Sequence, residues 1–436
     1  MMKKNRTIYF LLALVCLGLQ SCLFQEEDYF DDSSANRATA DVKRCSELLE
    51  AAPNGWVMEY YVGKDYSLGG ITLLCKFDGQ RVTMASQIAG ADETVSSLYS
   101  VKSEQATMLS FDTYNYLVHY FGQPQGSMAD DPNGTLGGDY EFVISDATAD
   151  RIELKGKKYG NRIVMKAFSA DQTWKQYLTR IKKVEDDAFF YEYDLRMDGL
   201  YTGQMLRSNY TFIVTYYDEV GEVHQKTVPF MFTTDGMRFH EPVTIDGQTM
   251  QNFVWKNEEI SFVCTDEGAT EVKLAGVYTA GYQSYDYYPG TYQMDFYRLN
   301  DATNQMEVAS QEIQLVKDED GKSYWLKGLE YDILVTYDKP RGGLSILPQF
   351  LKKVQGGYVY LAMWDLMNDY VLRSSAIGLI SYPTTDGIYL VDNGVWMGEI
   401  SGFIFGVYDS QDEEASFMGY TDAVAAIRLI KKTIEE

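Results

Sequence analysis

The chain has 436 residues, a length that predicts two or three domains. Acidic residues outnumber basic residues by 63 to 38, and the formal net charge of −25 argues against a nucleic-acid binder, which needs a basic face to neutralise phosphates. Hydrophobic residues make up 45% of the chain, enough for ordinary cores, which excludes wholesale disorder.

The N-terminus has the pattern of an export signal. A basic start precedes an uncharged run, Ile8–Leu19, which is too short to span a membrane as a helix. The run ends in Leu19-Gln20-Ser21-Cys22, and a small residue directly before Cys resembles a bacterial lipobox. We therefore expect residues 1–21 to be a lipoprotein signal peptide and Cys22 to be lipidated. The alternative is ordinary secretory cleavage beside a chance Cys.

An acidic tether is expected over residues 22–34. Its Glu26-Glu27-Asp28 run resembles the surface-export signal of Bacteroidetes lipoproteins, whereas a merely solvated tether is the other interpretation. An acidic protein is repelled by an anionic membrane surface, so acyl chains rather than a protein face would hold it there. The expected location is the outer membrane, lipid-anchored, at the cell surface.

Residues 35–184 predict an N-terminal helix followed by a β domain. Apolar residues recur at helical spacing over residues 36–51, and Pro53-Asn54-Gly55 ends this helix. Strand-like runs and Asp-Gly turns follow. A second helix is predicted after Ser169, which forms a capping-box pattern with Gln172, and this helix closes the domain near residue 184.

Strand patterns continue over a middle β domain, residues 185–275, and a C-terminal β domain, residues 276–436. Turn pairs such as Asp235-Gly236 and Gly356-Gly357 separate short alternating runs. The expected fold class is mainly β: tandem antiparallel β-sandwich or barrel-like domains, with a short N-terminal helix and one inter-domain helix.

The cysteines predict neither a disulfide framework nor a metal knuckle. Without Cys16 and Cys22, the odd number Cys45, Cys75 and Cys264 remains, at wide spacing. Cys75 lies in an apolar run, so we expect it to be a buried, inert thiol.

No catalytic residue is predicted. The three histidines, His119, His224 and His240, have no metal-ligand spacing, and no nucleophile elbow or phosphate-binding glycine loop occurs. A catalytic carboxylate pair stays an open alternative, because spacing between separate strands does not report the distance that a glycosidase needs.

Calcium is a second open alternative. The loops Asp130–Gly134 and Asp318–Gly321 offer oxygen ligands, although neither has EF-hand spacing and solvated turns explain both. No other cofactor is expected, and the metal ligands, if any, stay undetermined.

A tyrosine-rich segment, residues 278–290, is the candidate binding surface. Loop tyrosines combine a flat apolar face with a hydroxyl group, which suits sugar rings and partner loops. We expect ligand contacts from Tyr282, Tyr285, Tyr287 and Tyr288. The alternative is that these rings pack over the seam between the second and third domains.

Several separated segments resemble one family along nearly the whole chain. They are Ala52-Pro53-Asn54-Gly55-Trp56, Phe111-Asp112-Thr113-Tyr114-Asn115, Gly137-Gly138-Asp139-Tyr140-Glu141-Phe142, Gly156-Lys157-Lys158-Tyr159-Gly160-Asn161 and Phe232-Thr233-Thr234-Asp235-Gly236-Met237-Arg238-Phe239. With the lipobox, they resemble the domain-of-unknown-function 4302 lipoproteins of gut Bacteroidetes. The resemblance implies partner proteins rather than a reaction: a TonB-dependent transporter with its substrate-binding lipoprotein. The family has no assigned catalytic residues.

The expected function is an accessory binding protein of a glycan or peptide uptake system. One alternative is a carboxylate- or calcium-dependent hydrolase that acts on an extracellular polymer, and another is a structural scaffold of the transporter complex. The sequence leaves open the ligand, any catalysis, the oligomeric state, the domain packing and the face of the membrane reached.

Overall fold

The computed structural model describes residues 33–124, 134–218, 220–300, 303, 305–412 and 414–432. The expected signal peptide, the lipidation site Cys22, most of the acidic tether and residues 130–133 of the first calcium loop lie outside the described residues. Strands make up 54% and helices 11% of the structure, which confirms a mainly β fold class. None of the helices in the described ranges has the length and apolar character that crossing a bilayer requires.

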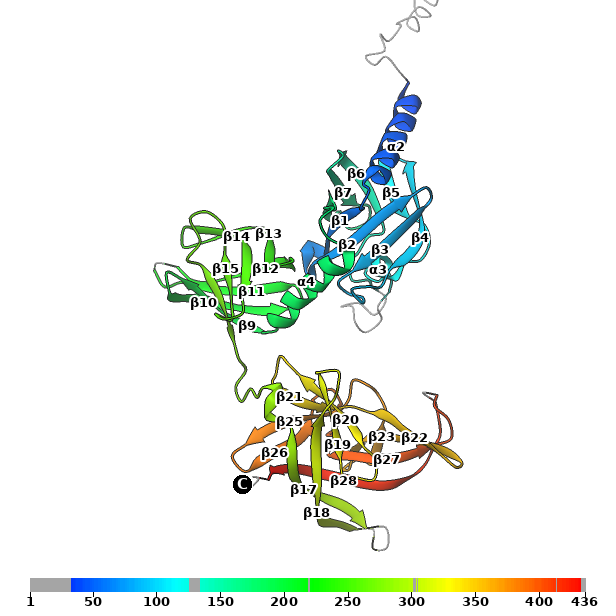
Figure 1. Cartoon of the computed structure of the whole chain (residues 1–436), viewed down its shortest axis with the longest axis vertical. Helices are drawn as coiled ribbons and strands as arrows, with labels where there is room; N and C mark the ends of the chain where they lie inside the picture. The colour runs from blue at the N-terminus through cyan, green and yellow to red at the C-terminus, as the bar shows by residue number, and fades with distance from the viewer. Residues whose placement is uncertain are drawn as a thin grey trace, which may run out of the picture. The chain divides into compact units, whose positions relative to one another are not determined.

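Eight antiparallel strands form a first closed barrel in which each strand pairs with the next and β8 pairs with β1 (Figure 1). The strands are β1 (Trp56–Val62), β2 (Gly69–Asp78), β3 (Arg81–Ser86), β4 (Val95–Ser103), β5 (Thr107–Phe111), β6 (Glu141–Ala147), β7 (Arg151–Gly156) and β8 (Arg162–Ala167). The short helix α3 (Tyr116–His119) lies between β5 and β6, and the 3-10 helix η2 (Lys64–Tyr66) between β1 and β2.

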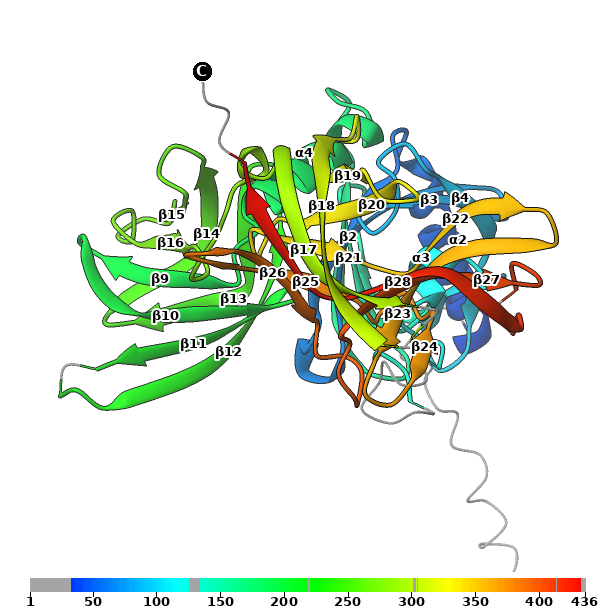
Figure 2. The same ribbon diagram turned by 90° about the horizontal axis from the view of Figure 1, so that it is seen from below.

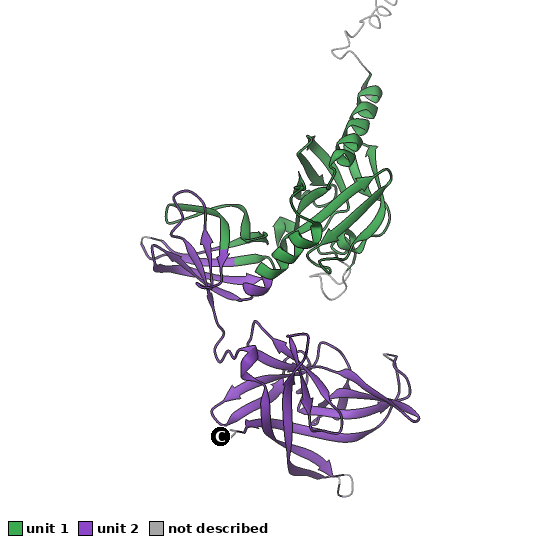
Figure 3. Cartoon of the chain, viewed as in Figure 1, with its two compact units in different colours: residues 1–184, 209–212, 227–254 green, residues 185–208, 213–226, 255–436 purple. Residues whose placement is uncertain are grey.

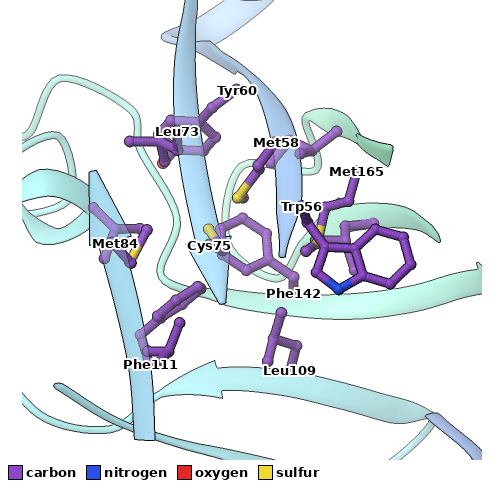
Figure 4. Packing of buried hydrophobic residues seen from close by; sticks show 14 of the residues in the cluster. Trp56, Met58, Tyr60, Leu73, Cys75, Met84, Leu109, Phe111, Phe142 and Met165 are labelled. Atoms are coloured by element: carbon purple, nitrogen blue, oxygen red, sulfur yellow. The ribbon is translucent and has the colours of Figure 1, made fainter. Parts of the chain in front are cut away.

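The interior of the first barrel is filled by side chains. Alternate positions of the strands point inward, so Trp56, Met58 and Tyr60 of β1 join residues from β2, β5, β6 and β8 in one core (Figure 4). The expected first helix is confirmed as α2 (Ser34–Ala51), and its buried face adds Cys45 and Leu49 to this core. The Trp56 indole N–H donates to the carbonyl of Leu49 at 2.8 Å, which fixes the end of α2 on the barrel.

Helix α4 (Trp174–Asp187) packs on the outer face of the first barrel. Leu178 is buried against Leu74 of β2 and Ala85 of β3. The expected helix is confirmed, but its predicted start is wrong. The capping box is formed by Thr173 and Gln176, because the Gln176 N–H donates to Thr173 Oγ1 (3.2 Å) and the Thr173 N–H donates to Gln176 Oε1 (2.9 Å).

A second closed barrel follows, and β16 closes it by pairing with β9. Its strands are β9 (Glu192–Met197), β10 (Leu200–Ser208), β11 (Thr211–Tyr217), β12 (Val223–Phe232), β13 (Gly236–Ile245), β14 (Gln248–Lys256), β15 (Ser261–Cys264) and β16 (Lys273–Val277). Asp198 and Gly199 join β9 to β10 with φ values of 50° and 79°, and this left-handed pair is the turn that matches strand twist.

The third sheet has twelve strands. They are β17 (Gly290–Asn300), β18 (Gln305–Lys317), β19 (Ser323–Lys327), β20 (Ile333–Asp338), β21 (Gly343–Ile346), β22 (Gln349–Val354), β23 (Gly357–Asp365), β24 (Tyr370–Leu372), β25 (Leu379–Thr384), β26 (Gly387–Asp392), β27 (Gly402–Tyr408) and β28 (Phe417–Lys431). The 3-10 helix η4 (Tyr285–Tyr287) precedes β17.

The strand pairings of the third sheet form a closed ring, and a smaller side sheet is joined to that ring through β28. Strands β17 to β21, β25, β26 and β28 form a closed circuit, because β28 pairs with both β26 and β17. The first half of the long strand β28 pairs instead with β27, which continues through β23 to β22 and β24 (Figure 2). We call β22, β23, β27 and the first half of β28 the side sheet.

Contacts between residues divide the chain into two compact units (Figure 3). The first unit comprises residues 1–184, 209–212 and 227–254, and the second comprises residues 185–208, 213–226 and 255–436. The strands of the second barrel are therefore divided between the two units.

Candidate functional site

The predicted tyrosine-rich surface is largely a packed cluster of the third domain. Tyr285 stacks on Tyr324 with 4.7 Å between the ring centroids, and its hydroxyl group donates to the carbonyl of Ser323 at 2.8 Å. The Tyr282 ring lies 4.5 Å from Tyr278, and the hydroxyl groups of Tyr282 and Tyr337 are hydrogen-bonded at 3.2 Å. These rings hold the chain that enters β17 against the ring of strands.

The structure contradicts a ligand-binding role for Tyr288. Its side chain is 0% exposed, and its hydroxyl group donates to the carbonyl of Gly342 at 2.9 Å. Burial inside the third domain satisfies both the ring and the hydroxyl group, so nothing is left to reach a ligand. Tyr287 is 39% exposed under Lys431, and ligand contacts by Tyr282, Tyr285 and Tyr287 stay predictions.

A different set of aromatic side chains lies on one face of the side sheet. Phe350 of β22 is directly opposite Tyr360 of β23, Tyr360 is opposite Gly406 of β27, and Gly406 is opposite Tyr420 of β28. A second row runs parallel to the first, because Tyr358 is opposite Tyr408, and Tyr408 is opposite Phe417. Residues two apart on a strand share a face, so both rows lie on the same side. We call these six aromatic residues and Gly406 the aromatic face.

The rings of the aromatic face form a continuous chain of contacts. The ring centroids are 5.4 Å apart for Phe350 and Tyr360, 5.7 Å for Tyr360 and Tyr408, and 5.5 Å for Tyr408 and Phe417. A Cβ atom at Gly406 would lie 2.9 Å from the Tyr408 ring and 3.1 Å from the Phe417 ring. Gly406 therefore leaves room for the Tyr408 and Phe417 rings over the strand.

Two cations are stacked on these rings. The Arg373 guanidinium lies 4.2 Å from the centroid of Tyr408 and 4.9 Å from that of Tyr360, and it also donates to the carbonyl of Asp412 at 2.6 Å. Lys353 Nζ lies 5.3 Å above Tyr358. Each contact stabilises the ring positions and places an N–H donor beside an apolar surface.

One end of this side-sheet face is covered and the other is exposed. Toward the β24 side, Ala362, Trp364 and Ile404 are buried beneath Leu299 and Val371. Over the aromatic face the exposed fractions are 44% for Phe350, 46% for Phe417 and 38% for Tyr420, while Tyr408 between them is only 4% exposed. Large apolar groups left in solvent in one place mark a recognition surface rather than a core.

Sequence reasoning missed the aromatic face. The signal was the alternation Tyr358-Val359-Tyr360-Leu361, in which Val359 and Leu361 are buried and the tyrosines face outward. One strand alone does not reveal which residues of distant strands lie beside it.

The histidines and carboxylates have the following environments. His119 is hydrogen-bonded to the backbone of Asn115, and His240 lies between the rings of Tyr61 and Tyr66. In the predicted calcium loop Asp318–Gly321, Asp320 accepts the backbone N–H groups of Lys322 and Ser323, as an ordinary turn does.

One trio of side chains has metal-ligand geometry. The ligand atoms of Asp218, Glu222 and His224 lie within 4.8 Å of one another on the hairpin between β11 and β12. His224 Nε2 and Asp218 Oδ2 are 3.0 Å apart, and an Nε2–H···Oδ2 hydrogen bond accounts for this contact. Because Asp218 also accepts the N–H groups of Val220 and Glu222, the trio is explained as a hairpin turn.

Solved structures match this chain only weakly, whereas family models match it clearly. None of the curated proteins matches the chain. A protein of unknown function of the DUF3598 family from Nostoc punctiforme is 8% identical with a TM-score of 0.15, and the match covers 56% of this chain and 98% of that one. A variant of the vaccine antigen transferrin binding protein B from Haemophilus parasuis is 11% identical with a TM-score of 0.13, covering 85% and 67% of the two chains. Intact transferrin binding protein B described as Ap-TbpB is 12% identical with a TM-score of 0.12, covering 84% and 67%. TM-scores this low do not show that these proteins share a fold with this chain.

Two family models match the chain in tandem. A second domain of unknown function, DUF4987, matches residues 265–404, which include most strands of the third sheet and all residues of the aromatic face up to Tyr360. The domain of unknown function DUF4302 matches residues 26–257. Because this match spans more than half of the sequence, the chain belongs to the DUF4302 family.

Proposed function

We propose that the protein is a lipid-anchored, surface-exposed accessory binding protein of the outer membrane that binds a glycan chain on its aromatic face. The single observation that carries the binding role is the double row of aromatic side chains across β22, β23, β27 and β28. Four neighbouring strands span about 14 Å at the usual strand spacing, which is enough for several sugar units. The anchor at Cys22 and partnership with a TonB-dependent transporter and its binding lipoprotein are supported by the lipobox and the family resemblance.

The chemistry of the aromatic face favours a glycan over a peptide. Flat rings offer apolar faces to the C–H groups of sugars at little conformational cost, and tyrosine hydroxyl groups, the Arg373 N–H groups and nearby backbone carbonyls offer hydrogen bonds at the rim. The aromatic rows lie on the face of the side sheet, whereas a peptide that adds as a strand would use the outer edge of β22, which pairs only with β23.

The test is binding of soluble polysaccharides by the chain from residue 23, measured by calorimetry and affinity electrophoresis. The variant with Phe350→Ala, Phe417→Ala and Tyr420→Ala should bind at least 10-fold more weakly, because each lost stacking contact contributes roughly 0.5–1.5 kcal/mol. Tyr382→Ala is the matched control, since Tyr382 is a 62% exposed tyrosine on β25, outside the face. Equal affinity of the triple variant and the wild type for a bound glycan would refute the assignment.

Two further measurements separate the alternatives. Release of reducing ends from a bound polymer would indicate a hydrolase. Recovery of a TonB-dependent transporter with the full lipidated chain, together with no binding of any glycan, would indicate a scaffold.

A further inference from the structure

A groove on the outer face of the first barrel lies far along the chain from the aromatic face and is built by different elements. Its volume is about 590 Å³, within the usual range of roughly 300–1,000 Å³ for ligand sites. The walls come from the turn after α2, from β2 and β3, and from the segment that leads into α4. All of these residues belong to the first compact unit.

The register of the barrel places the polar groups of the groove. On β2, Leu74 and Lys76 point outward, and Leu74 is covered by α4. Lys76 lies one outward position further along, directly opposite Thr83 of β3. Because α4 begins only at Trp174, the outer surface near Lys76 is not covered by the helix and forms the floor of the groove.

An immobilised aromatic ring lines the groove. The Trp174 indole N–H donates to the carbonyl of Asn54 at 3.0 Å. Gly55 has φ +82°, and a Cβ atom there would lie 2.5 Å from the Cys75 carbonyl oxygen and 3.0 Å from Trp174 Cζ2. The Phe168 N–H donates to the Gly55 carbonyl at 2.8 Å, which ties the two loops together. The ring is therefore held in place before any ligand arrives, which lowers the entropic cost of binding.

Four polar side chains around this ring are unused. Within the described part of the chain, Asn54, Lys76, Asp171 and Gln172 make no side-chain hydrogen bond or ion pair, although all four line the groove. Lys76 supplies donors, Asp171 supplies acceptors and the two amides supply both. The two charges are of opposite sign, so the groove does not select for an anion or a cation.

We propose that this groove binds one neutral sugar unit, with Trp174 as the stacking platform and Lys76, Asp171 and the two amides as hydrogen-bonding partners. A sugar presents an apolar face of C–H groups and a rim of hydroxyl groups that each donate and accept, which matches a fixed indole ringed by unpaired donors and acceptors. This site is independent of the aromatic face, so an experiment can refute one of the two binding proposals without affecting the other.

The experiment is a titration of the full chain from residue 23, containing fluorinated tryptophan, with a panel of neutral methyl hexosides. The ¹⁹F resonance of Trp174, identified by its loss in Trp174→Phe, should shift on saturation with at least one hexoside. In the Lys76→Ala, Asp171→Ala double variant the dissociation constant should rise about 10-fold, because two hydrogen bonds are lost. Both side chains are exposed and unpaired, so this variant should keep the wild-type melting temperature.

Two controls make the result decisive. Lys327→Ala with Asp332→Ala removes an exposed Lys and Asp from the third domain and should change nothing. The Phe350→Ala, Phe417→Ala, Tyr420→Ala variant should keep the Trp174 shift, which separates this groove from the aromatic face. The proposal is overturned if no hexoside moves the Trp174 resonance, or if the double variant titrates like the wild type.

Discussion

Glu59 points outward from β1 and joins this strand to β8 and β13 through two ion pairs. Its carboxylate is 14% exposed and accepts from Arg238 Nη2 of β13 at 2.5 Å and from Lys166 Nζ of β8 at 2.7 Å. Burial raises the pKa of Glu59, but Arg238 and Lys166 outweigh this effect and hold the pKa below its usual value. Two residues along, Tyr61 packs on His240 of the same strand β13.

Glu59→Gln should lower the free energy of unfolding by about 3 kcal/mol, because it leaves Arg238 half-buried without its counter-charge. Glu153→Gln is the matched control: Glu153 also pairs with two cations, Arg151 and Arg162, but these are 44% and 75% exposed, so its loss should cost less than about 1 kcal/mol. Chemical denaturation measures both. Equal small losses would show that the Glu59 cluster is not stabilising.

The same region should make stability fall with acidification. Burial lowers the pKa of His240 below its ordinary value of 6.5, so the unfolded chain binds a proton first and stability declines as the pH falls below 6.5. The pKa of Glu59 is also lowered from 4.5, so its contribution is present above pH 4.5 and is lost as the pH falls through its folded value. Melting temperatures between pH 7 and pH 4 should decline, and His240→Gln should flatten the upper part of that decline. A pH-independent melting temperature would contradict this account.

Among the elements, α4 shows what local sequence can and cannot locate. Its apolar stripe was predictable from the 3.6-residue period, and Leu178 and Ile181 are buried as that stripe requires. Two capping-box patterns lie four residues apart, Ser169 with Gln172 and Thr173 with Gln176. The local sequence does not show which of the two pairs caps α4. Packing of Phe168 on Tyr177 and the bond from Trp174 to Asn54 favour the later start.

Thr173→Ala should destabilise the protein by about 1 kcal/mol, because it removes the side-chain acceptor for the first turn of α4. Ser169→Ala is the control and should have almost no effect. Thermal unfolding of both variants decides between the two caps: a larger loss for Ser169→Ala would contradict the structure.

At the scale of the whole molecule, the family boundaries and the sheet boundaries differ. The DUF4302 match ends at residue 257, just after β14, whereas the second barrel is completed by β15 and β16, which end at Val277. Strand β16 pairs with five residues of β9, from Glu192 to Arg196. The second barrel therefore needs residues from beyond the DUF4302 match.

A chain that ends at residue 257 should be less stable than one that ends at residue 284. The shorter chain leaves β9 as an unpaired edge and removes the buried residues Phe262 and Leu274 from the barrel. Limited proteolysis and soluble yield compare the two. Equal protease resistance would show that the barrel does not need its last two strands.

Local sequence patterns were enough to predict the mainly β class, both long helices, the buried thiol Cys75 and most tight turns, because these follow from local periodicity, Asp-Gly and Gly-Gly pairs and apolar runs. It also supplied the family through segments spread along the chain. Three features emerge only in the folded chain: the sheets close into barrels, Tyr288 is buried, and Phe350, Tyr360 and Tyr420 lie in one row. Those facts depend on strand register between residues far apart in the sequence, and register is set by the packing of whole sheets rather than by any one segment.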